Sequence, residues 1–284
     1  MDVADVWRQH RRWSIVTSRA DRFLRRWRSV NFGLIVAGSA LGALAAQDTW
    51  FSTTVTVALG IVGASALAVA AVLQSRVLST EKLRERVAAR ATSETMKGLV
   101  FQYLAGVEPF AGADRDLALN AKVKEVRDRA TARKSLTMGV EPDDKPLPSI
   151  IGIADYVRGR AEDQRNWHDR RSGDHRTLAG RWRAAEVIAT AAAAVLAAAG
   201  GVLHGPDLSA WVAVATTVAA AIAAHLAVQQ HERIADAYGQ TVIDLDALLG
   251  DLDPAIADPA RAAAFVADVE RVLAAQNGAW VSLF

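Results

Sequence analysis

The sequence predicts an all-α membrane protein with two tandem transmembrane hairpins, long cytoplasmic helices and both termini in the cytoplasm. Two charge-poor stretches indicate this fold, because residues 29–74 contain one formal charge, Asp48, and residues 187–230 contain one, Asp207. A third observation is that the segments flanking these stretches are strongly basic. The averages over 284 residues, 51% hydrophobic and 23% charged, would fit a soluble protein. The apolar content excludes a disordered chain, and the absence of cysteine excludes a disulfide scaffold.

Each charge-poor stretch divides at a short polar turn, which predicts four spans at 30–46, 50–73, 184–203 and 208–228. Three of them reach the roughly 20 residues needed to cross a hydrocarbon core of about 30 Å. The first is shorter, but Arg28 could extend it by snorkelling to the headgroups. The alternative is a water-soluble bundle with Ala-rich buried helices. A soluble helix normally keeps a charged stripe, whereas these spans contain a single charged residue, Glu186.

The distribution of basic residues predicts the orientation of the spans. The turns at 47–49 and 204–207 contain no Lys or Arg, whereas residues 1–28 contain eight arginines and residues 76–183 contain 22 Lys and Arg. Positively charged flanks stay in the cytoplasm, so we expect a multi-pass protein of the inner membrane with cytoplasmic N- and C-termini. Ala43-Leu44-Ala45 resembles a signal-peptide cleavage site, but 28 residues are long for a leader. We therefore expect the first span to be retained.

The sequence repeats with an offset of 155 residues. Arg26-Trp27-Arg28 precedes the first span as Arg181-Trp182-Arg183 precedes the third, and Gln74 closes the second span as Gln229 closes the fourth. Between the repeats, residues 139–148 hold three of the seven prolines, which end helices and mark a linker. The prediction is therefore a first two-span unit at 1–140 and a second at 141–284.

Apolar side chains recur at helical spacing after the second and fourth spans, and again in a terminal helix that begins near Asp258. The pattern predicts that each of these helices buries one face. Two interpretations stay open, because the buried face could contact a partner subunit or pack within one subunit. The positions are Leu83, Val87, Thr95, Leu99, Phe101, Leu104 and Val107; Ile234, Tyr238, Val242, Leu245 and Leu249; and Phe265, Val269, Val272 and Leu273.

One helix face combines aromatic and hydrogen-bonding side chains just before the third span. Its residues follow one another at steps of four, four, three and one, and they are Tyr156, Arg160, Gln164, Trp167 and His168. This pattern resembles the helix that leads into the membrane pair of the SLATT family, also known as DUF4231. These are two-spanning proteins that associate with nucleotide-synthesising SMODS and nucleotide-sensing SLOG domains. His168 departs from the family pattern, which usually has tyrosine there.

The first repeat resembles a sister branch of the same family. The matching segments are Glu94-Thr95-Met96-Lys97, Phe101-Gln102-Tyr103 and Glu108-Pro109-Phe110, while Val269-Glu270, Asn277 and Trp280 resemble the closing helix of the second branch. The resemblance implies an inner-membrane oligomeric pore or ion-channel-like effector of bacterial conflict and anti-phage defence, with a nucleotide-signalling protein as partner. The alternatives are a membrane-anchored scaffold or sensor that recruits cytoplasmic partners, and a non-defence ion channel or transporter.

No converging set of catalytic groups is present, so we expect the chain not to be an enzyme and to need no cofactor. His168, Asp169, Asp174 and His175 lie among arginines, a poor setting for a cation, and we interpret them as solvated helix surface. The phosphate-loop and nucleophile-elbow motifs are also missing. The basic N-terminal arm lies directly before a span, which favours contact with anionic lipid over nucleic acid.

Several intramembrane positions are candidates for a pore or for helix packing. Four small thin helices cannot enclose a water-filled path, so a pore requires a homo-oligomer. Polar residues in spans often face water or a partner, and small residues let helices approach closely. The polar candidates are Asn31, Glu186, His225, Thr216 and Thr217; the packing candidates are Gly38, Gly42, Gly60 and Ala64; and the interface anchors are Trp27 and Trp182 on the inner side and Trp50 and Trp211 on the outer side.

Overall fold

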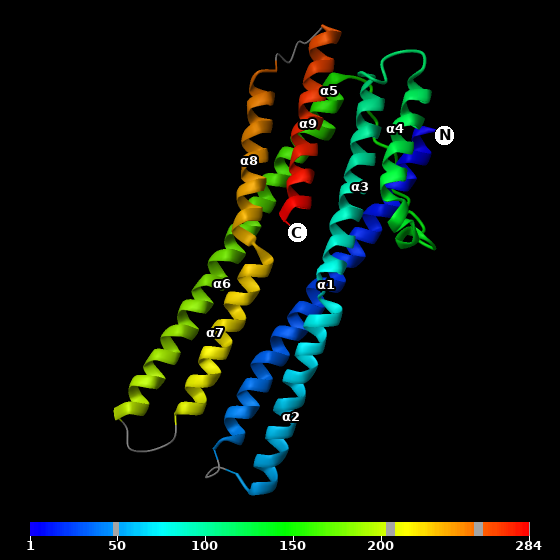
Figure 1. Cartoon of the computed structure of the whole chain (residues 1–284). Helices are drawn as coiled ribbons and strands as arrows, with labels where there is room; N and C mark the ends of the chain where they lie inside the picture. Colours follow the sequence, from blue (N-terminus) through cyan, green and yellow to red (C-terminus); the bar gives the residue numbers. More distant parts are fainter. Residues whose placement is uncertain (48–50, 203–207, 253–257, 284) are drawn as a thin grey trace. The chain divides into compact units, whose positions relative to one another are not determined.

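The computed structural model describes residues 1–47, 51–202, 208–252 and 258–283, and the described residues form helices and no strand (Figure 1). The prediction of an all-helical chain is therefore confirmed for this part of the protein. The helices are α1 (Val3–Ala45), α2 (Thr53–Val72), α3 (Thr80–Ala105), α4 (Arg115–Ala130), α5 (Ile153–Tyr156), α6 (Asp163–Val202), α7 (Ser209–Gln229), α8 (His231–Gly250) and α9 (Pro259–Leu283), with the shorter turns η1 (Leu73–Val77), η2 (Thr131–Thr137) and η3 (Val157–Glu162).

The chain forms two compact units in space. We call Met1–Arg22, Thr80–Gly173 and Ile234–Phe284 the core unit, and Phe23–Ser79 and Asp174–Arg233 the hairpin unit. Both units take segments from each half of the sequence, because α1 and α6 begin in the core unit and continue into the hairpin unit. The division of the sequence at residue 140 describes the repeat rather than these units, and it stays a prediction.

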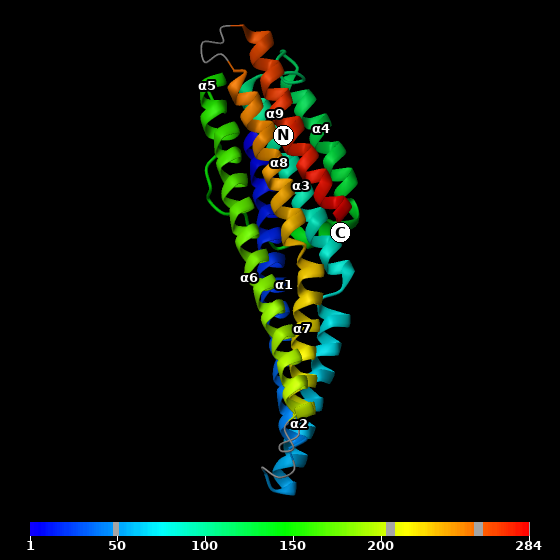
Figure 2. The same ribbon diagram turned by 90° about the vertical axis from the view of Figure 1, so that its left-hand side faces the viewer.

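The hairpin unit contains the four apolar spans. The spans lie in α1, α2, α6 and α7, each long and apolar enough to cross a membrane. In Figures 1 and 2, α6 and α7 run side by side as one hairpin. The predicted ends of the first and third spans and both ends of the second and fourth agree with the helix ends to within about three residues, whereas the predicted starts at 30 and 184 lie inside the longer helices α1 and α6. The turns between the paired helices lie largely outside the described residues.

The segment before each pair of spans is helical and continuous with the first span. α1 runs without interruption through the arginine-rich segment into the apolar segment, and α6 does the same in the second repeat. The second span of each pair ends in an irregularity instead. α2 passes into the π-helical turn η1, and α7 ends at Gln230, whose φ of 47° is left-handed. The helices that follow, α3 and α8, can therefore take their own directions.

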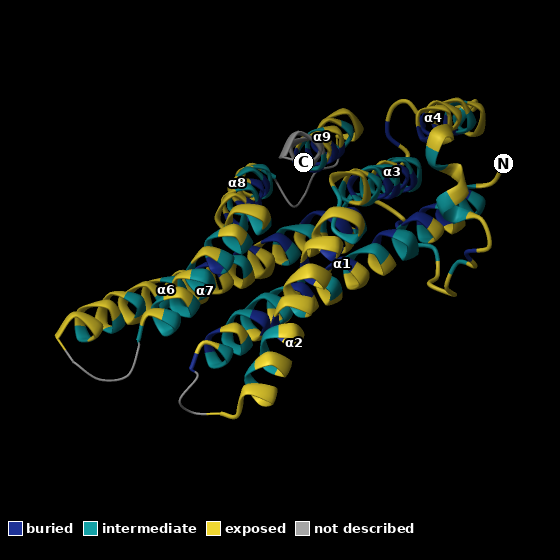
Figure 3. Cartoon of the chain, turned by 60° about the horizontal axis from the view of Figure 1, so that its bottom comes forward, coloured by how far each residue is buried: buried dark blue, intermediate teal, exposed yellow. Residues whose placement is uncertain are grey.

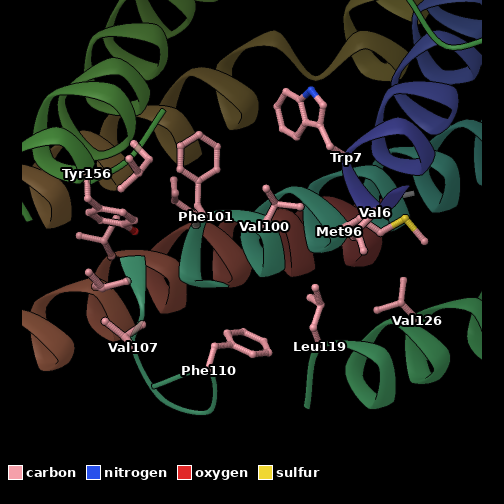
Figure 4. Packing of buried hydrophobic residues seen from close by; sticks show 14 of the residues in the cluster. Val6, Trp7, Met96, Val100, Phe101, Val107, Phe110, Leu119, Val126 and Tyr156 are labelled. Carbon is pink, nitrogen blue, oxygen red and sulfur yellow. The ribbon is translucent and has the colours of Figure 1, made fainter. Parts of the chain in front are cut away.

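The core unit is built around one apolar cluster, part of which is shown in Figure 4. α3 lies at its centre and packs against both α9 and α4. Met96, Val100 and Phe101 on α3 are buried, as is Val269 on α9. Apart from Thr95, which is exposed, the residues of the apolar stripes predicted on α3, α8 and α9 are buried or half-buried, which favours packing within one chain for these faces. The bounds of α4 and its buried residue Leu119 were not predicted from the sequence.

The proline-rich segment at 139–148 packs on the first turns of α1. The indole nitrogen of Trp7 donates a hydrogen bond of 2.9 Å to the carbonyl oxygen of Lys145. Nε of Arg11 donates one of 2.7 Å to the Asp143 carboxylate. Proline ends helix formation here as predicted, but the segment is held by hydrogen bonds and is not a free linker.

Candidate functional site

A buried ion pair joins the π-helical turn η3, which precedes α6, to α9 in the core unit. Arg160 donates two hydrogen bonds to Glu270, from Nε to Oε1 at 2.8 Å and from Nη2 to Oε2 at 2.9 Å. The hydroxyl of Tyr156 donates a third to Oε1 of the same carboxylate at 3.0 Å. Arg160 is 2% exposed and Glu270 is 6% exposed. Two of the residues singled out by the motif therefore converge on one carboxylate.

Helix α3 forms the floor of this site. The guanidinium carbon of Arg160 lies 4.7 Å from the centre of the Phe101 ring, a cation–π distance. A Cβ atom on Gly98 would lie 2.9 Å from Oε2 of Glu270, so a side chain at this position would displace the carboxylate. Burial lowers the pKa of Arg160, but the Glu270 carboxylate outweighs burial and raises it. Burial and then Glu270 raise the pKa of Tyr156. Arg160 is thus charged and Tyr156 is neutral at physiological pH.

A cavity of about 270 Å³ lies beside the ion pair and brings further charged groups to it. Its lining includes Glu94, Arg160 and Glu270. Burial, followed by the positive charge of Arg160, lowers the pKa of Lys97 to about 8. Burial raises the pKa of Glu94, but Lys97, Arg160 and Arg90 together outweigh it and lower the pKa overall. Charges of both signs therefore surround Arg160, whose Nη1 is buried without a hydrogen-bond partner.

Two of the remaining motif residues, Trp167 and His168, pack on α8. The rings of Trp167 and His168 each lie 5.4 Å from the ring of Tyr238 in edge-to-face contacts. Nη2 of Arg90 on α3 donates a long hydrogen bond of 3.4 Å to the Tyr238 hydroxyl. Gln164 provides its carbonyl oxygen, 2.7 Å from Nδ1 of His168. The motif face therefore joins α5 and η3 to α9 through Tyr156 and Arg160, and α6 to α8 through Trp167 and His168.

The partner of the motif, Glu270, was missed as a site residue by sequence reasoning. The sequence does contain a signal that Glu270 is buried, because this charged residue lies on α9 beside the apolar residues Val269 and Leu273, which are buried. Charged residues are almost never fully buried unless they are paired. An acid within an apolar stripe therefore predicts a buried base elsewhere in the chain, although it does not identify which one.

A second buried polar group in the core unit predicts a dependence of stability on pH. His10, outside the apolar spans and 3% exposed, donates from Nδ1 to the carbonyl oxygen of Ser93 at 2.8 Å. Burial lowers the pKa of His10 to about 4, although the bond to Ser93 acts in the opposite direction. The unfolded chain therefore binds more protons than the folded chain between pH 6.5 and pH 4, and stability falls as the pH drops through this window.

We expect the unfolding temperature in detergent to fall between pH 7 and pH 4.5 and to fall less for His10→Gln. The full loss from His10 is about 3 kcal/mol below pH 4, since each unit of pKa shift is worth about 1.4 kcal/mol. Glutamine keeps a donor for the Ser93 carbonyl oxygen but cannot be protonated. Identical pH profiles for the two proteins would contradict this assignment.

In the hairpin unit, the polar residues gather at one end of the apolar helices around a pocket. The pocket has a volume of about 470 Å³ and is lined by residues of α1, α2 and α7. Asn31 and His225, two of the predicted intramembrane candidates, both line it. The lining residues are Arg28, Asn31, Phe32, Ile35, Leu67, Ala70, Ala71, Gln74, Leu78, Ala221, Ala224, His225, Val228 and Gln229.

The two glutamines that the repeat relates both bond to α1 at this pocket. The amide nitrogen of Asn31 donates to Oε1 of Gln74 at 3.3 Å. Nη1 of Arg28 donates to Oε1 of Gln229 at 3.0 Å. Oδ1 of Asn31 is buried and makes no hydrogen bond in the described structure. The polar end of the pocket thus has an acceptor that a ligand could satisfy.

An aromatic group surrounds the histidine at the same level. The ring of His225 lies 4.3 Å from that of Trp182 and 6.3 Å from that of Phe32. Phe32 and Trp182 are themselves 5.4 Å apart in an edge-to-face contact. Trp182, predicted from sequence as an interface anchor, therefore lies level with the polar end of the pocket.

The other polar candidates do not line this pocket. Glu186 is half-buried on α6. The hydroxyls of Thr216 and Thr217 on α7 donate to carbonyl oxygens one turn back in their own helix, at 2.8 Å each. These threonines satisfy their hydroxyls locally, so their presence in a span needs no pore to explain it. Of the remaining anchors, Trp27 and Trp211 are half-buried, and Trp50 lies outside the described residues.

The closest approach between α1 and α2 occurs at two glycines. A Cβ atom on Gly38 would lie 2.9 Å from Cγ of Leu67, and one on Gly63 would lie 2.9 Å from the carbonyl oxygen of Gly38. By contrast, a Cβ on Gly42 meets nothing within 4 Å, and one on Gly60 makes only an ordinary contact at 3.7 Å. Ala64 is exposed. The packing pair is thus Gly38 with Gly63, and the sequence analysis had named only the first.

The histidines and acids do not form a metal site among the described residues. The prediction that His168 lies on a solvated helix surface is wrong. Its side chain is 2% exposed, because Tyr238 on α8 packs against it. His175 instead lies beside His231, with the two Nδ1 atoms 2.9 Å apart.

Two hairpins of membrane-length apolar helices place the chain among multi-pass α-helical membrane proteins. Two family models match it, one described as "SMODS and SLOG-associating 2TM effector domain 1" over residues 156–280, and one described as a protein of unknown function, DUF4231, over residues 11–116. The chain therefore belongs to the SLATT family and carries two units, which confirms the resemblance seen in the sequence. Comparison with curated proteins and with solved structures gave no match.

Proposed function

We propose that the chain is an inner-membrane effector whose apolar helices assemble with those of further copies into a pore. The observation that carries this proposal is how little of the apolar helices the chain itself covers. In the most apolar 18 residues of α6 none is buried, and in those of the helix containing α7 only 6% are buried. Figure 3 shows exposed and intermediate residues along α6 and α7. Lipid or further subunits must cover these surfaces.

The composition of α6 indicates that further subunits, and not lipid alone, contact its exposed apolar surface. Alanine or glycine occupies 12 of the 19 positions from 184 to 202. Apolar attraction between helices is weak in lipid, so helices associate where small side chains allow close contact. Glu186 lies on this same helix, and in the repeat it corresponds to Asn31. Since a carboxylate is costly in lipid, an oligomer with Glu186 facing water is favoured over a lipid-exposed monomer.

The orientation and the partners belong to the same proposal. The basic segments support a cytoplasmic location for both termini and the middle of the chain, because positively charged flanks stay on that side of the membrane. The family description names SMODS and SLOG domains, which supports a nucleotide-signalling protein as the partner that triggers permeabilisation in anti-phage defence. The effector acts without catalysis and without a cofactor, on lipid and not on nucleic acid.

Ion flux from liposomes tests the pore. We expect the purified chain to release trapped K⁺ with a rate that rises more steeply than linearly with the protein-to-lipid ratio, because several copies must meet. Ala194→Trp on the exposed face of α6 should lower the rate about tenfold by blocking close contact. Ala58→Trp, at an exposed position of α2, is the matched control and should leave the rate within about twofold. Equal rates with all three proteins, or no release at any ratio, would refute the proposal.

A second candidate function is a membrane-anchored scaffold, which a groove in the core unit favours. This groove, of about 580 Å³, lies between α3 and α4. Its floor includes Val87 and Val126, and its lining includes Arg84, Arg129 and Arg133. An apolar floor with basic edges is suited to an acidic amphipathic helix of a partner. A scaffold would retain its partner after the four spans are replaced by unrelated ones and would cause no ion flux.

A further inference from the structure

The groove between α3 and α4 and the exposed face of α8 have opposite charges, and each carries an apolar strip. We propose that α8 of a second copy of the chain occupies this groove, so that the core units of neighbouring copies contact one another. The inference deepens the proposed function and rests on it, because a pore needs several copies. It identifies one contact between those copies that lies outside the apolar spans.

The groove has an apolar floor and basic edges. Its floor includes Val87, which is buried, and its described lining contains three arginines and no Asp or Glu. Along α3 the lining runs from Arg84 to Thr95, which is about 16 Å at 1.5 Å per residue, or about three turns of a helix. Arg129 lies 3.6 Å from Glu125 one turn away in α4, but exposed pairs of this kind contribute little. The groove therefore suits a helix with an acidic surface.

The exposed face of α8 is acidic and has an apolar residue at its centre. The segment 231–251 contains five acids and one arginine. Ile243 is 62% exposed, and Ala247, one turn further on, is exposed as well. Asp236 is exposed and lies about two turns before Ile243, on the same face. From Asp236 to Ala247 this face is about 16 Å long, which equals the length of the groove.

The opposite face of α8 is held against α6 within one chain. The buried ring of Tyr238 contacts the rings of Trp167 and His168. The hydroxyl of Ser172 donates a hydrogen bond of 2.8 Å to the carbonyl oxygen of Ala235. These contacts leave the acidic face of α8 on the surface of its own chain, where a second copy can reach it.

Charge and apolar contact both favour this occupant of the groove. Arginine and carboxylate form strong charge-assisted hydrogen bonds, and a basic helix would be repelled by the arginines of the groove. Covering Ile243 removes apolar surface from water. The groove and α8 are different surfaces, so the contact is heterologous, and repeating it forms a ring where the rotation closes. A ring of copies is the arrangement that a pore requires.

Disulfide crosslinking tests the contact, because the chain contains no cysteine of its own. Full-length Thr92→Cys, in the groove, and Ala247→Cys, on α8, are reconstituted together in liposomes and oxidised. We expect about tenfold more crosslinked dimer than from Leu117→Cys with Ala247→Cys. Leu117 is the matched control, since it is 71% exposed on α4 and does not line the groove.

Substitutions at exposed positions test the two contributions without disturbing the core. In the crosslinking pair, Arg129→Glu should lower the dimer yield about tenfold, whereas Lys124→Glu, the same charge change on α4 outside the groove, should stay within about twofold. Ile243→Ser should also lower the yield about tenfold. Its control is Met138→Ser, an equally exposed apolar residue that does not line the groove, and this change should leave the yield within about twofold.

Equal yields with Thr92→Cys and Leu117→Cys, no dimer at all, or equal effects of Arg129→Glu and Lys124→Glu would each overturn the proposal. Release of K⁺ is measured from the same liposomes under reducing conditions, which separates this contact from the pore. Release without crosslinking in the groove would keep the pore and overturn the contact. Crosslinking without release would keep the contact and refute the pore. Circular dichroism checks that each variant is folded.

Discussion

Replacing Glu270 with leucine is expected to lower the free energy of unfolding of the core unit by about 3–5 kcal/mol, the usual cost of breaking a buried ion pair on one side. The substitution leaves the guanidinium of Arg160 buried on top of Phe101 without its carboxylate. It also removes the acceptor of the Tyr156 hydroxyl. In a domain of this size, each kcal/mol corresponds to about 2–4 °C in unfolding temperature, so a fall of about 10 °C is expected in detergent.

A double variant distinguishes the two possible causes of this loss of stability, which are the unpaired charge of Arg160 and the loss of packing. Arg160→Met with Glu270→Leu removes both charges and should recover most of the lost stability, because apolar replacements of buried ion pairs are often neutral. The matched control is Asp246→Asn, which breaks the exposed pair that Arg165 forms at 2.8 Å. Exposed pairs contribute little, so this change should cost less than about 1 kcal/mol. If Asp246→Asn lowers the free energy of unfolding as much as Glu270→Leu, burial does not explain the contribution of the Arg160–Glu270 pair to stability.

Replacing Gly63 with leucine is expected to separate α1 from α2 and to abolish most of the ion release from liposomes. Already the first side-chain atom would lie 2.9 Å from the carbonyl oxygen of Gly38 and 3.1 Å from the amide nitrogen of Gly42. Backbone atoms cannot move aside as a side chain can, so the helices themselves must shift. We expect a cost of about 2 kcal/mol and a flux reduced about tenfold.

Gly42→Ala serves as the control for this prediction. Its Cβ would meet nothing within 4 Å, and alanine is the better helix former by about 1 kcal/mol. The variant should therefore be as stable as the original protein or more so, with unchanged flux. Loss of flux in Gly42→Ala but not in Gly63→Leu would show that the hairpin does not pack through the pair that the structure indicates.

Much of the fold was predictable because charge and hydropathy act locally. A run of apolar residues such as 208–228 must lie in an apolar environment wherever it occurs, so its helix could be placed closely from the sequence. The bounds and the buried face of α4 were not predicted, because that face is short and the remaining surface of the helix is highly charged. The π-helical turn η1 and the left-handed Gln230 were missed as well, since both depend on how successive helices pack.

The site residues divide in the same way. Tyr156 and Arg160 were found because a motif at helical spacing is visible in the sequence. Their partner Glu270 lies more than 100 residues away, and only folding brings it within 3 Å. Asn31 and His225 were found as polar residues in spans, but their shared pocket was not. The glycines show the limit most directly. Gly42 and Gly63 both lie in apolar helices, and only the structure shows that a Cβ atom would clash with the neighbouring helix at Gly63 and not at Gly42.

By itself, the sequence determined the four apolar spans, the repeat of 155 residues and the membership of the SLATT family. The spans rest on composition, the repeat rests on matching segments at a fixed offset, and the family rests on its motifs and on the two family models that match. The tertiary structure alone decided that Arg160 pairs with Glu270, that Gly38 meets Gly63, and that the polar ends of α1, α2 and α7 enclose an amphipathic pocket. The physical reason is that hydrogen bonds and van der Waals contacts fall off within a few ångströms, so their partners are fixed by packing and not by separation along the chain.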